Sequence, residues 1–236
     1  MNSFRLREFR SGDRFEVAEL IYASINAWYA QHAMGQRFRA GPQMTEVYCD
    51  VYFGIGSSRC VVAENQRSGR LMGSCFYHPR AGHVGLGIMN VHPNYFGFGI
   101  ASALLKYICD FTDDNPYPSL RLTQSALNLD SFSLYNRAGF VPVQAYQDLK
   151  VPVPEEGLGR FVPGSDRVRN ATLDDVPALV ALEEELSGVS RQEDYRFCVE
   201  NSLGFFHSSV YEGVSGDSKA FCSPRLTLPA ICWDRA

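Results

Sequence analysis

IMNVHPNYFGFGIASALL, residues 88–105, is the stretch of sequence that decides how this chain is expected to fold. It begins as an apolar strand, stops at Pro93, passes through Gly97 and Gly99, and continues from Ile100 with the composition of a helix. Glycine adopts left-handed backbone conformations freely and lets a ligand come close to the main chain. The first N–H groups of a helix have no partner within the helix and, together with the helix dipole, attract anions. The stretch therefore predicts a strand–turn–helix unit with an anion at the turn, although a glycine pair in this position can also be an ordinary tight turn.

Two landmarks in the right order extend this prediction to a family. The run from Val91 to Ala101 resembles the central motif of the GNAT superfamily of N-acetyltransferases, a Q/R-x-x-G-x-G/A loop that grips the pyrophosphate of acetyl-CoA. Further along, Asn128 and then the run LYNRAGF at 134–140 resemble the second landmark of that family, an Asn followed by Leu-Tyr-x-x-x-Gly-Phe. The resemblance covers about residues 4–150. It implies an α/β fold with a mixed sheet, the GNAT-like acyl-CoA N-acyltransferase fold.

The resemblance also implies a set of site residues and acetyl-CoA as co-substrate. The backbone of the strand would pair with the pantetheine arm, N–H groups of the loop and first helical turn would hold the pyrophosphate, and Asn128 would hydrogen-bond the pantetheine. Tyr135 would stand near the sulfur as general acid, and its alternative role is that of a core tyrosine. The backbone positions are Met89, Asn90, Val91, Gly97, Phe98, Gly99, Ile100, Ala101 and Ser102.

The chain departs from the family pattern at the loop and at the general base. Phe96 stands where Gln or Arg is usual and Phe98 where a basic residue is common, so charge would have to come from Lys106 or Arg121. Thr123 stands five residues before Asn128, where the family often has a Glu. The strand at 84–91 contains no carboxylate, which leaves His83, Glu46 and Asp50 as candidate bases, acting directly or through water. An ordinary surface group is the more common role for each of the three. A missing base favours an acceptor amine of low pKa.

Composition excludes several other classes of protein. A net charge of −4 and a pI near 5.7 argue against a nucleic-acid partner. The apolar stretches are far shorter than a membrane span and the N-terminus lacks the apolar core of a signal peptide, so we expect a cytoplasmic protein without membrane association. Seven scattered cysteines without a Cys-x-x-Cys pair suggest neither a disulfide framework nor a metal site.

Periodicity and turn residues predict the elements around the motif. Strands are expected at 4–9, 60–63, 71–77, 84–91, 120–125 and 140–143, and helices at 15–28, 45–53, 100–111 and 131–137.

The rest of the chain is predicted to hold a second, incomplete module. We divide the sequence into a GNAT-like domain at 1–150, a Pro- and Gly-containing linker at 151–165 and a partial second GNAT-like module at 166–236. Arg7, Asp13, Val17 and Leu20 have counterparts at one constant offset in Arg169, Asp175, Leu179 and Leu182. Thr172 and Ser190 are expected to cap two helices, and a strand is expected at 205–211. The alternative is a chance repetition of a strand–helix pattern, and no glycine loop recurs before the chain ends.

The leading hypothesis is an N-acetyltransferase in which a primary amine of a small molecule or peptide attacks acetyl-CoA directly in a ternary complex. The alternative is a catalytically inactive acyl-CoA-binding module. A dinucleotide-binding fold is disfavoured because the glycine pairs at 85–87 and 97–99 do not extend to G-x-G-x-x-G. The acceptor is expected to contact residues 28–44, and a homodimer is left open as the assembly state.

Overall fold

The computed structural model describes residues 3–145, 152, 154–157, 159, 162–213 and 218–222. The chain forms two compact units, Met1–Ala138 and Gly139–Ala236, each with its own sheet. The predicted linker lies partly outside the described residues, and so does the predicted second module at 214–217 and 223–236.

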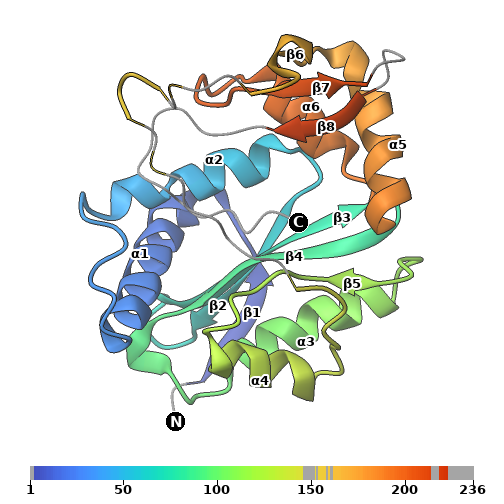
Figure 1. Ribbon diagram of the computed structural model, residues 1–236. Helices are drawn as coiled ribbons and strands as arrows, with labels where there is room; N and C mark the ends of the chain where they lie inside the picture. Colours follow the sequence, from blue (N-terminus) through green and yellow to red (C-terminus); the bar gives the residue numbers. More distant parts are fainter. Residues whose placement is uncertain are drawn as a thin grey trace. The chain divides into compact units, whose positions relative to one another are not determined.

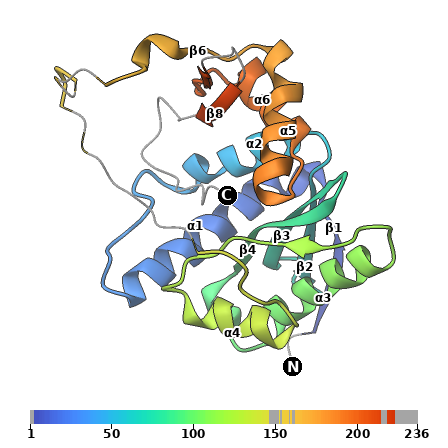
Figure 2. The same ribbon diagram turned by 45° about the vertical axis from the view of Figure 1, so that its right-hand side comes forward.

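In the first unit, one strand and two helices are followed by three consecutive strands and then by a helix, a strand and a helix (Figures 1 and 2). Its strands are β1 (Phe4–Glu8), β2 (Arg59–Asn65), β3 (Leu71–Arg80), β4 (His83–Val91) and β5 (Leu120–Arg121). Its helices are α1 (Arg14–Gln31), α2 (Val47–Gly54), α3 (Ile100–Asp113) and α4 (Leu129–Arg137), with 3₁₀ turns η1 (Ser11–Asp13), η2 (Pro42–Thr45) and η3 (Pro93–Tyr95). The predicted mixed α/β class is confirmed.

The five strands form one sheet in the order β1-β2-β3-β4-β5. Neighbours are antiparallel except β4 and β5, which run parallel. The parallel pair is short and consists of two residue pairs, Val84 with Leu120 and Gly85 with Arg121. Beyond Gly85 the described part of β4 therefore has a sheet neighbour on the β3 side alone.

Helices pack on both faces of this sheet, as two consecutive residues of β3 show. A Cβ at Gly73 would meet Ile100 and Leu104 of α3, whereas the next residue, Ser74, is paired with Asn90 of β4, whose side chain contacts Ser24 of α1. Successive strand residues point to opposite faces, so α1 and α3 cover opposite faces. The core between them is apolar, and α3 buries the stripe Ile100, Leu104, Leu105 and Ile108.

The last two predicted strands of the first domain differ from what is found. The expected strand at 120–125 ends at Arg121, and residues 140–143 are not a strand. Val141 and Val143 are 74% and 91% exposed. Their β-branched side chains have strand propensity, but propensity is expressed when a neighbouring strand covers the residue.

The second unit carries a smaller antiparallel sheet of order β6-β7-β8, with strands β6 (Val168–Asn170), β7 (Ser209–Glu212) and β8 (Ser218–Cys222). Its helices are α5 (Val176–Ser187) and α6 (Gln192–Glu200), with 3₁₀ turns η4 (Ser165–Arg167) and η5 (Leu173–Asp175). The predicted cap at Thr172 is confirmed, because Thr172 and Asp175 form a capping box. The predicted cap at Ser190 is wrong: α6 has Arg191 at its N-cap, with no side-chain cap.

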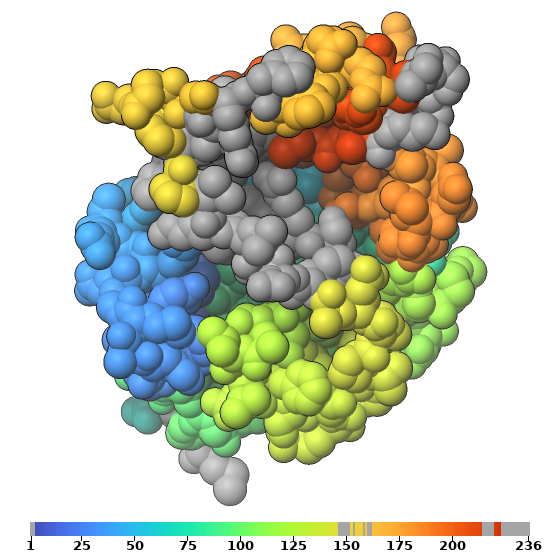
Figure 3. All heavy atoms as spheres, viewed as in Figure 1, coloured from blue at the N-terminus to red at the C-terminus, as the bar shows by residue number. Residues whose placement is uncertain are grey.

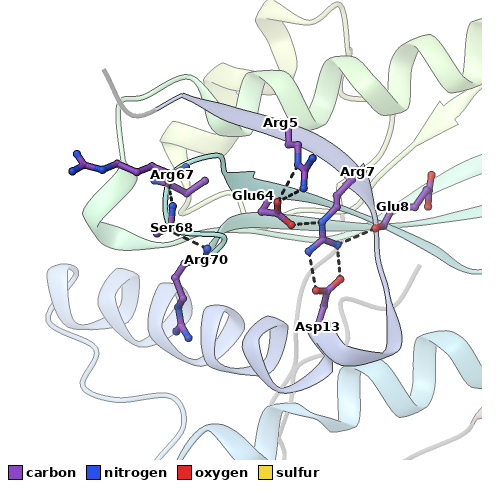
Figure 4. Close-up of polar contacts among 9 residues, drawn as sticks. Arg5, Arg7, Glu8, Asp13, Glu64, Arg67, Ser68 and Arg70 are labelled. Atoms are coloured by element: carbon purple, nitrogen blue, oxygen red, sulfur yellow. Dashed lines mark hydrogen bonds and ion pairs between the residues drawn. The ribbon is translucent and has the colours of Figure 1, made fainter.

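An arginine–aspartate pair closes the strand-to-helix connection in each unit. Arg7 donates from Nη1 to Asp13 Oδ2 (2.6 Å) and from Nη2 to Asp13 Oδ1 (2.9 Å), and its Nε bonds Glu64 of β2 (Figure 4). Asp13 Oδ2 also accepts the Arg10 N–H at 2.7 Å.

The second unit repeats the arginine–aspartate–glutamate arrangement of the first. Arg169 donates to both oxygens of Asp175 (2.8 and 2.7 Å) and from Nε to Glu212 of β7 (2.6 Å), and Asp175 accepts the Thr172 N–H at 2.8 Å. The constant offset in the sequence therefore corresponds to a repeated structural element.

No helix among the described residues is both long enough and apolar enough to span a membrane.

Candidate active site

The site is built around β4, whose backbone is irregular where it leaves β5. Cys75 of β3 lies opposite Met89, but Tyr77 lies opposite Leu86, so β4 has one more residue than β3 between these pairs. A bulge of this kind bends a strand, exposes unpaired backbone groups and is common beside active sites. The bulge falls next to the end of the β4–β5 pairing, so backbone groups near Gly87 and Met89 border the opening between the two strands.

The glycine loop follows β4 and leads into α3, as the sequence predicted. His92 is the N-cap of the 3₁₀ turn η3, and its Nδ1 accepts the N–H of Asn94 within that turn. Gly97 and Gly99 have φ of +80° and +79°, conformations that favour glycine. Gly99 is the N-cap of α3, and the N–H groups of Ile100, Ala101 and Ser102 form its first turn. These N–H groups have no acceptor within the helix, which makes the turn suited to an anion.

The loop has little side-chain charge to add. Phe96 and Phe98 are about half exposed, and Lys106, one candidate for supplying charge, is bonded to Asp110 four residues later (2.7 and 2.8 Å). An anion bound at this loop would depend mainly on backbone N–H groups.

A cavity of about 350 Å³ lies between α3 and α4, beside this first turn. Helix α4 is at the surface of the first unit (Figure 3). The cavity is lined by Ser102, Leu105, Lys106, Cys109, Asp110, Leu134, Arg137 and Ala138. The first helical turn and α4 therefore share a recess that is large enough for part of an extended ligand.

Tyr135 extends from α4 toward β3 and is almost fully buried. Burial raises the pKa of its hydroxyl above the ordinary value, and the nearby Cys75 raises that pKa further. Cys75 is paired with Met89, so the structure brings Tyr135 to the level of the bulged strand. The phenol is neutral at physiological pH and can act as a hydrogen-bond donor.

The other predicted residues have local roles in addition to any ligand contact. Asn128 is the N-cap of α4, and its Oδ1 accepts the Ser131 N–H at 3.1 Å. Asn90 turns its side chain toward α1, where Oδ1 accepts the Ser24 hydroxyl at 2.6 Å. Within the described part of the chain, the buried Asn90 Nδ2 has no hydrogen-bond partner. An unpaired buried donor is rare, and this one lies on the cofactor strand of the predicted site.

Sequence reasoning missed one polar residue next to the bulge. His78 of β3 is 4% exposed, and its Nδ1 lies 2.7 Å from Ser58 Oγ. A single histidine on a buried strand matches no spacing rule. The one sequence signal is the second glycine of the pair Gly85 and Gly87, because the missing side chain at Gly87 leaves room for the imidazole of His78. Among the described residues, no group of His, Cys, Asp and Glu could hold a metal ion.

The described residues form an α/β fold with a strand–loop–helix site, which can be compared with known proteins. Residues 56–142 match the family model of the acetyltransferase (GNAT) domain. The bulged strand β4 and the glycine loop both lie within the matched residues.

Solved structures have the same fold at low sequence identity. A tetramutant of the BH1408 protein from Bacillus halodurans is 17% identical with a TM-score of 0.52, and the match covers 62% of this chain and 99% of that chain. An acetyltransferase of the GNAT family from Staphylococcus aureus Mu50 is 14% identical with a TM-score of 0.50, over 60% of this chain and 87% of that chain. The sequence has no match among curated proteins.

Proposed function

We propose that this chain is an acetyl-CoA-dependent N-acetyltransferase that acetylates a primary amine of a small molecule or peptide. The observation that carries the proposal is the bulged strand β4, which separates from β5 and continues through a positive-φ glycine loop into α3. A separated strand offers backbone groups to an extended pantetheine-like chain, and the helix N-terminus that follows accepts a pyrophosphate.

Direct attack by the amine in a ternary complex requires that the leaving thiolate be stabilised. A thiol has a pKa of about 8.5 and a tyrosine hydroxyl about 10, so full proton transfer from a free tyrosine to a thiolate is uphill by about 2 kcal/mol. Burial raises the pKa of Tyr135 and makes this transfer harder. Tyr135 therefore acts by donating a hydrogen bond to the sulfur, which stabilises negative charge without requiring complete transfer.

The test is thermal unfolding with and without acetyl-CoA. A ligand that binds only the folded state raises the midpoint temperature of unfolding. At a ligand concentration of 100 times the dissociation constant, the free energy of unfolding increases by about 2.7 kcal/mol. In the Gly99→Glu variant the new carboxylate occupies the anion site, so we expect the shift to disappear.

The matched control is Gly69→Glu in the turn between β2 and β3. Gly69 also has a positive φ, of +71°, and open space around the Cβ position, as Gly99 has. This control has the same backbone strain and the same new charge and should keep the acetyl-CoA shift. The absence of any shift in the wild-type protein would overturn the proposed function.

A second candidate function is binding of acyl-CoA without catalysis, favoured by Phe96 and Phe98 in the loop. Thiol release measured across a panel of primary amines separates the two. Turnover with any amine supports the transferase, and acetyl-CoA binding without turnover supports the binding module.

A further inference from the structure

His78 occupies a position on the α2 side of the sheet that its neighbours fix closely. Ser58 Oγ lies 2.7 Å from its Nδ1, and the ring centroid of Tyr52 in α2 lies 4.7 Å from that of the imidazole. The side chain is buried. A contact on one nitrogen and a ring against one face restrict the imidazole to one orientation, with Nε2 directed away from Ser58.

The second observation is what Nε2 faces. A Cβ built on Gly87 of β4 would lie 2.6 Å from His78 Nε2 and 3.1 Å from Phe76. The imidazole therefore takes the space that a side chain at residue 87 would fill. Gly87 belongs to the bulge and follows Gly85, the last β4 residue paired with β5. Nε2 thus lies against β4 where this strand separates from β5.

The carboxylates suggested by the sequence are occupied elsewhere. Arg14 donates to Glu46 Oε2 at 2.9 Å and to Asp50 Oδ1 at 2.8 Å. Both belong to an ion-pair cluster between α1 and the start of α2. His83, the remaining candidate, is the first residue of β4 and precedes the opening between β4 and β5.

We propose that His78 is the general base for the acceptor amine, an assignment that rests on the proposed N-acetyltransferase function. With the Nδ1 proton donated to Ser58 Oγ, Nε2 carries the lone pair. Ser58 is a positioning residue, because it fixes the tautomer and the ring orientation. Tyr135 lies on the opposite, α3 face of the sheet with Cys75. The proposed base and the proposed hydrogen-bond donor therefore lie on opposite sides of the opening between β4 and β5.

The proton inventory of the reaction is complete with these groups. Nε2 takes one proton from the acceptor ammonium and passes it to solvent. The amine lone pair then forms the N–C bond to the thioester carbon, and the C–S bond breaks with its electron pair on sulfur. The second proton lost by nitrogen ends on the sulfur, where Tyr135 stabilises the developing charge. From the reference pKa values, the equilibrium for proton transfer to an imidazole is unfavourable by about 10-fold from an α-ammonium and by about 10⁴-fold from a lysine ammonium. A histidine base therefore favours an acceptor amine of low pKa.

The first test compares variants at and beside the imidazole. We expect His78→Gln to lower kcat by about 10² to 10⁴ while the affinity for acetyl-CoA, measured by calorimetry, stays within a factor of two. Gly87→Ala should displace the ring and lower kcat by at least about 10-fold. Gly85→Ala is the matched control: its Cβ would meet the flexible end of Arg80 at 2.3 Å and His78 Cβ at 3.7 Å, an ordinary contact distance. It should therefore leave the imidazole in place and kcat unchanged. Unchanged kcat in His78→Gln would overturn the assignment.

A second test uses the wild-type protein and needs no turnover. In protein labelled with ¹⁵N in the histidine rings, saturating acetyl-CoA should shift the His78 resonances and leave those of His83 in place. Acetyl-CoA that binds in calorimetry without moving the His78 resonances overturns this assignment alone. Acetyl-CoA that does not bind overturns the proposed function together with it.

Discussion

Tyr135 is a buried phenol whose pKa is raised by desolvation and by Cys75, so it remains protonated throughout the physiological range. Removing the hydroxyl removes the proposed donor to the departing sulfur and leaves the buried ring in place. We expect Tyr135→Phe to slow turnover by roughly 10² to 10⁴ with acetyl-CoA binding retained. The control Tyr107→Phe loses a hydroxyl that donates to Glu8 at 2.6 Å and should keep its turnover. Unchanged turnover in Tyr135→Phe would remove this residue from the mechanism.

Two serines near Asn90 have opposite hydrogen-bonding states. Ser74 is fully buried, and its hydroxyl has no partner in the part of the chain that the structure describes. Ser24 donates to Asn90 Oδ1 at 2.6 Å. Removing the unpaired hydroxyl of Ser74 should leave the free energy of unfolding unchanged or raise it. Removing the hydroxyl of Ser24 leaves the buried Asn90 Oδ1 without its donor, which costs about 1 to 3 kcal/mol of stability. Urea unfolding should therefore show Ser74→Ala at or above wild-type stability and Ser24→Ala below it; the reverse order would contradict this account.

At the scale of the glycine loop, the missing basic side chain can be restored. Phe96 is half exposed at the position where the resembled motif has Gln or Arg. A guanidinium at this position would form charge-assisted hydrogen bonds to a bound phosphate. Because the position is half exposed, solvent would weaken these bonds. We expect Phe96→Arg to tighten acetyl-CoA binding by about 3- to 10-fold, with a smaller gain at high salt because exposed charges are screened. Phe96→Met is the control without charge. Equal affinities of the two variants in calorimetry would show that the backbone alone determines binding at this loop.

The elements that the sequence predicted well are those whose signals are local. The α3 stripe, the strand that ends at Pro93 and the glycine N-cap follow from periodicity and turn residues, and the structure has them within a few positions. The early end of β5, the exposed Val141 and Val143 and the α6 cap depend on which neighbours cover each segment, and sequence periodicity carries no information about that. His78 was missed for the same reason: its position opposite Gly87 arises from the β3–β4 register and the bulge, which are set by pairing across the sheet.

At the scale of the whole molecule, the two units begin in the same way. A strand, a 3₁₀ turn and a helix are joined by an Arg–Asp pair, and the arginine also bonds a Glu two residues along the neighbouring strand from its own pairing partner. The order β6-β7-β8 repeats β1-β2-β3, with two helices between the first two strands in each case. We propose on this basis that the second unit copies the opening of the GNAT-like module. Among the described residues, this copy has no counterpart of β4 or the glycine loop, so the first unit carries the proposed site.

The repeated pair predicts equivalent acid sensitivity in both units. The hydrogen bonds from Arg169 lower the pKa of Asp175 below its ordinary value. Burial alone would raise the pKa of Asp13, but the bonds from Arg7 and the Arg10 N–H outweigh it and lower that pKa too. A carboxyl with a lowered folded-state pKa stabilises the fold above its unfolded pKa of about 3.9, and this stabilisation is lost as the pH falls further.

Asp175→Asn should therefore speed amide hydrogen exchange in β6 and α5 at pH 7, by an amount that corresponds to about 2 to 3 kcal/mol of local stability. Asp13→Asn should do the same in β1 and α1. Both differences from wild type should shrink as the pH falls below about 4, because the carboxyls of the opened state then become protonated and the advantage of the ion-paired folded state is progressively lost. The control is Asp174→Asn, since Asp174 is the exposed neighbour of Asp175, and exposed charges contribute about 0 to 1 kcal/mol. Equal effects of Asp174→Asn and Asp175→Asn would show that the Arg169 pair does not hold this connection and would remove the main support for a copied module.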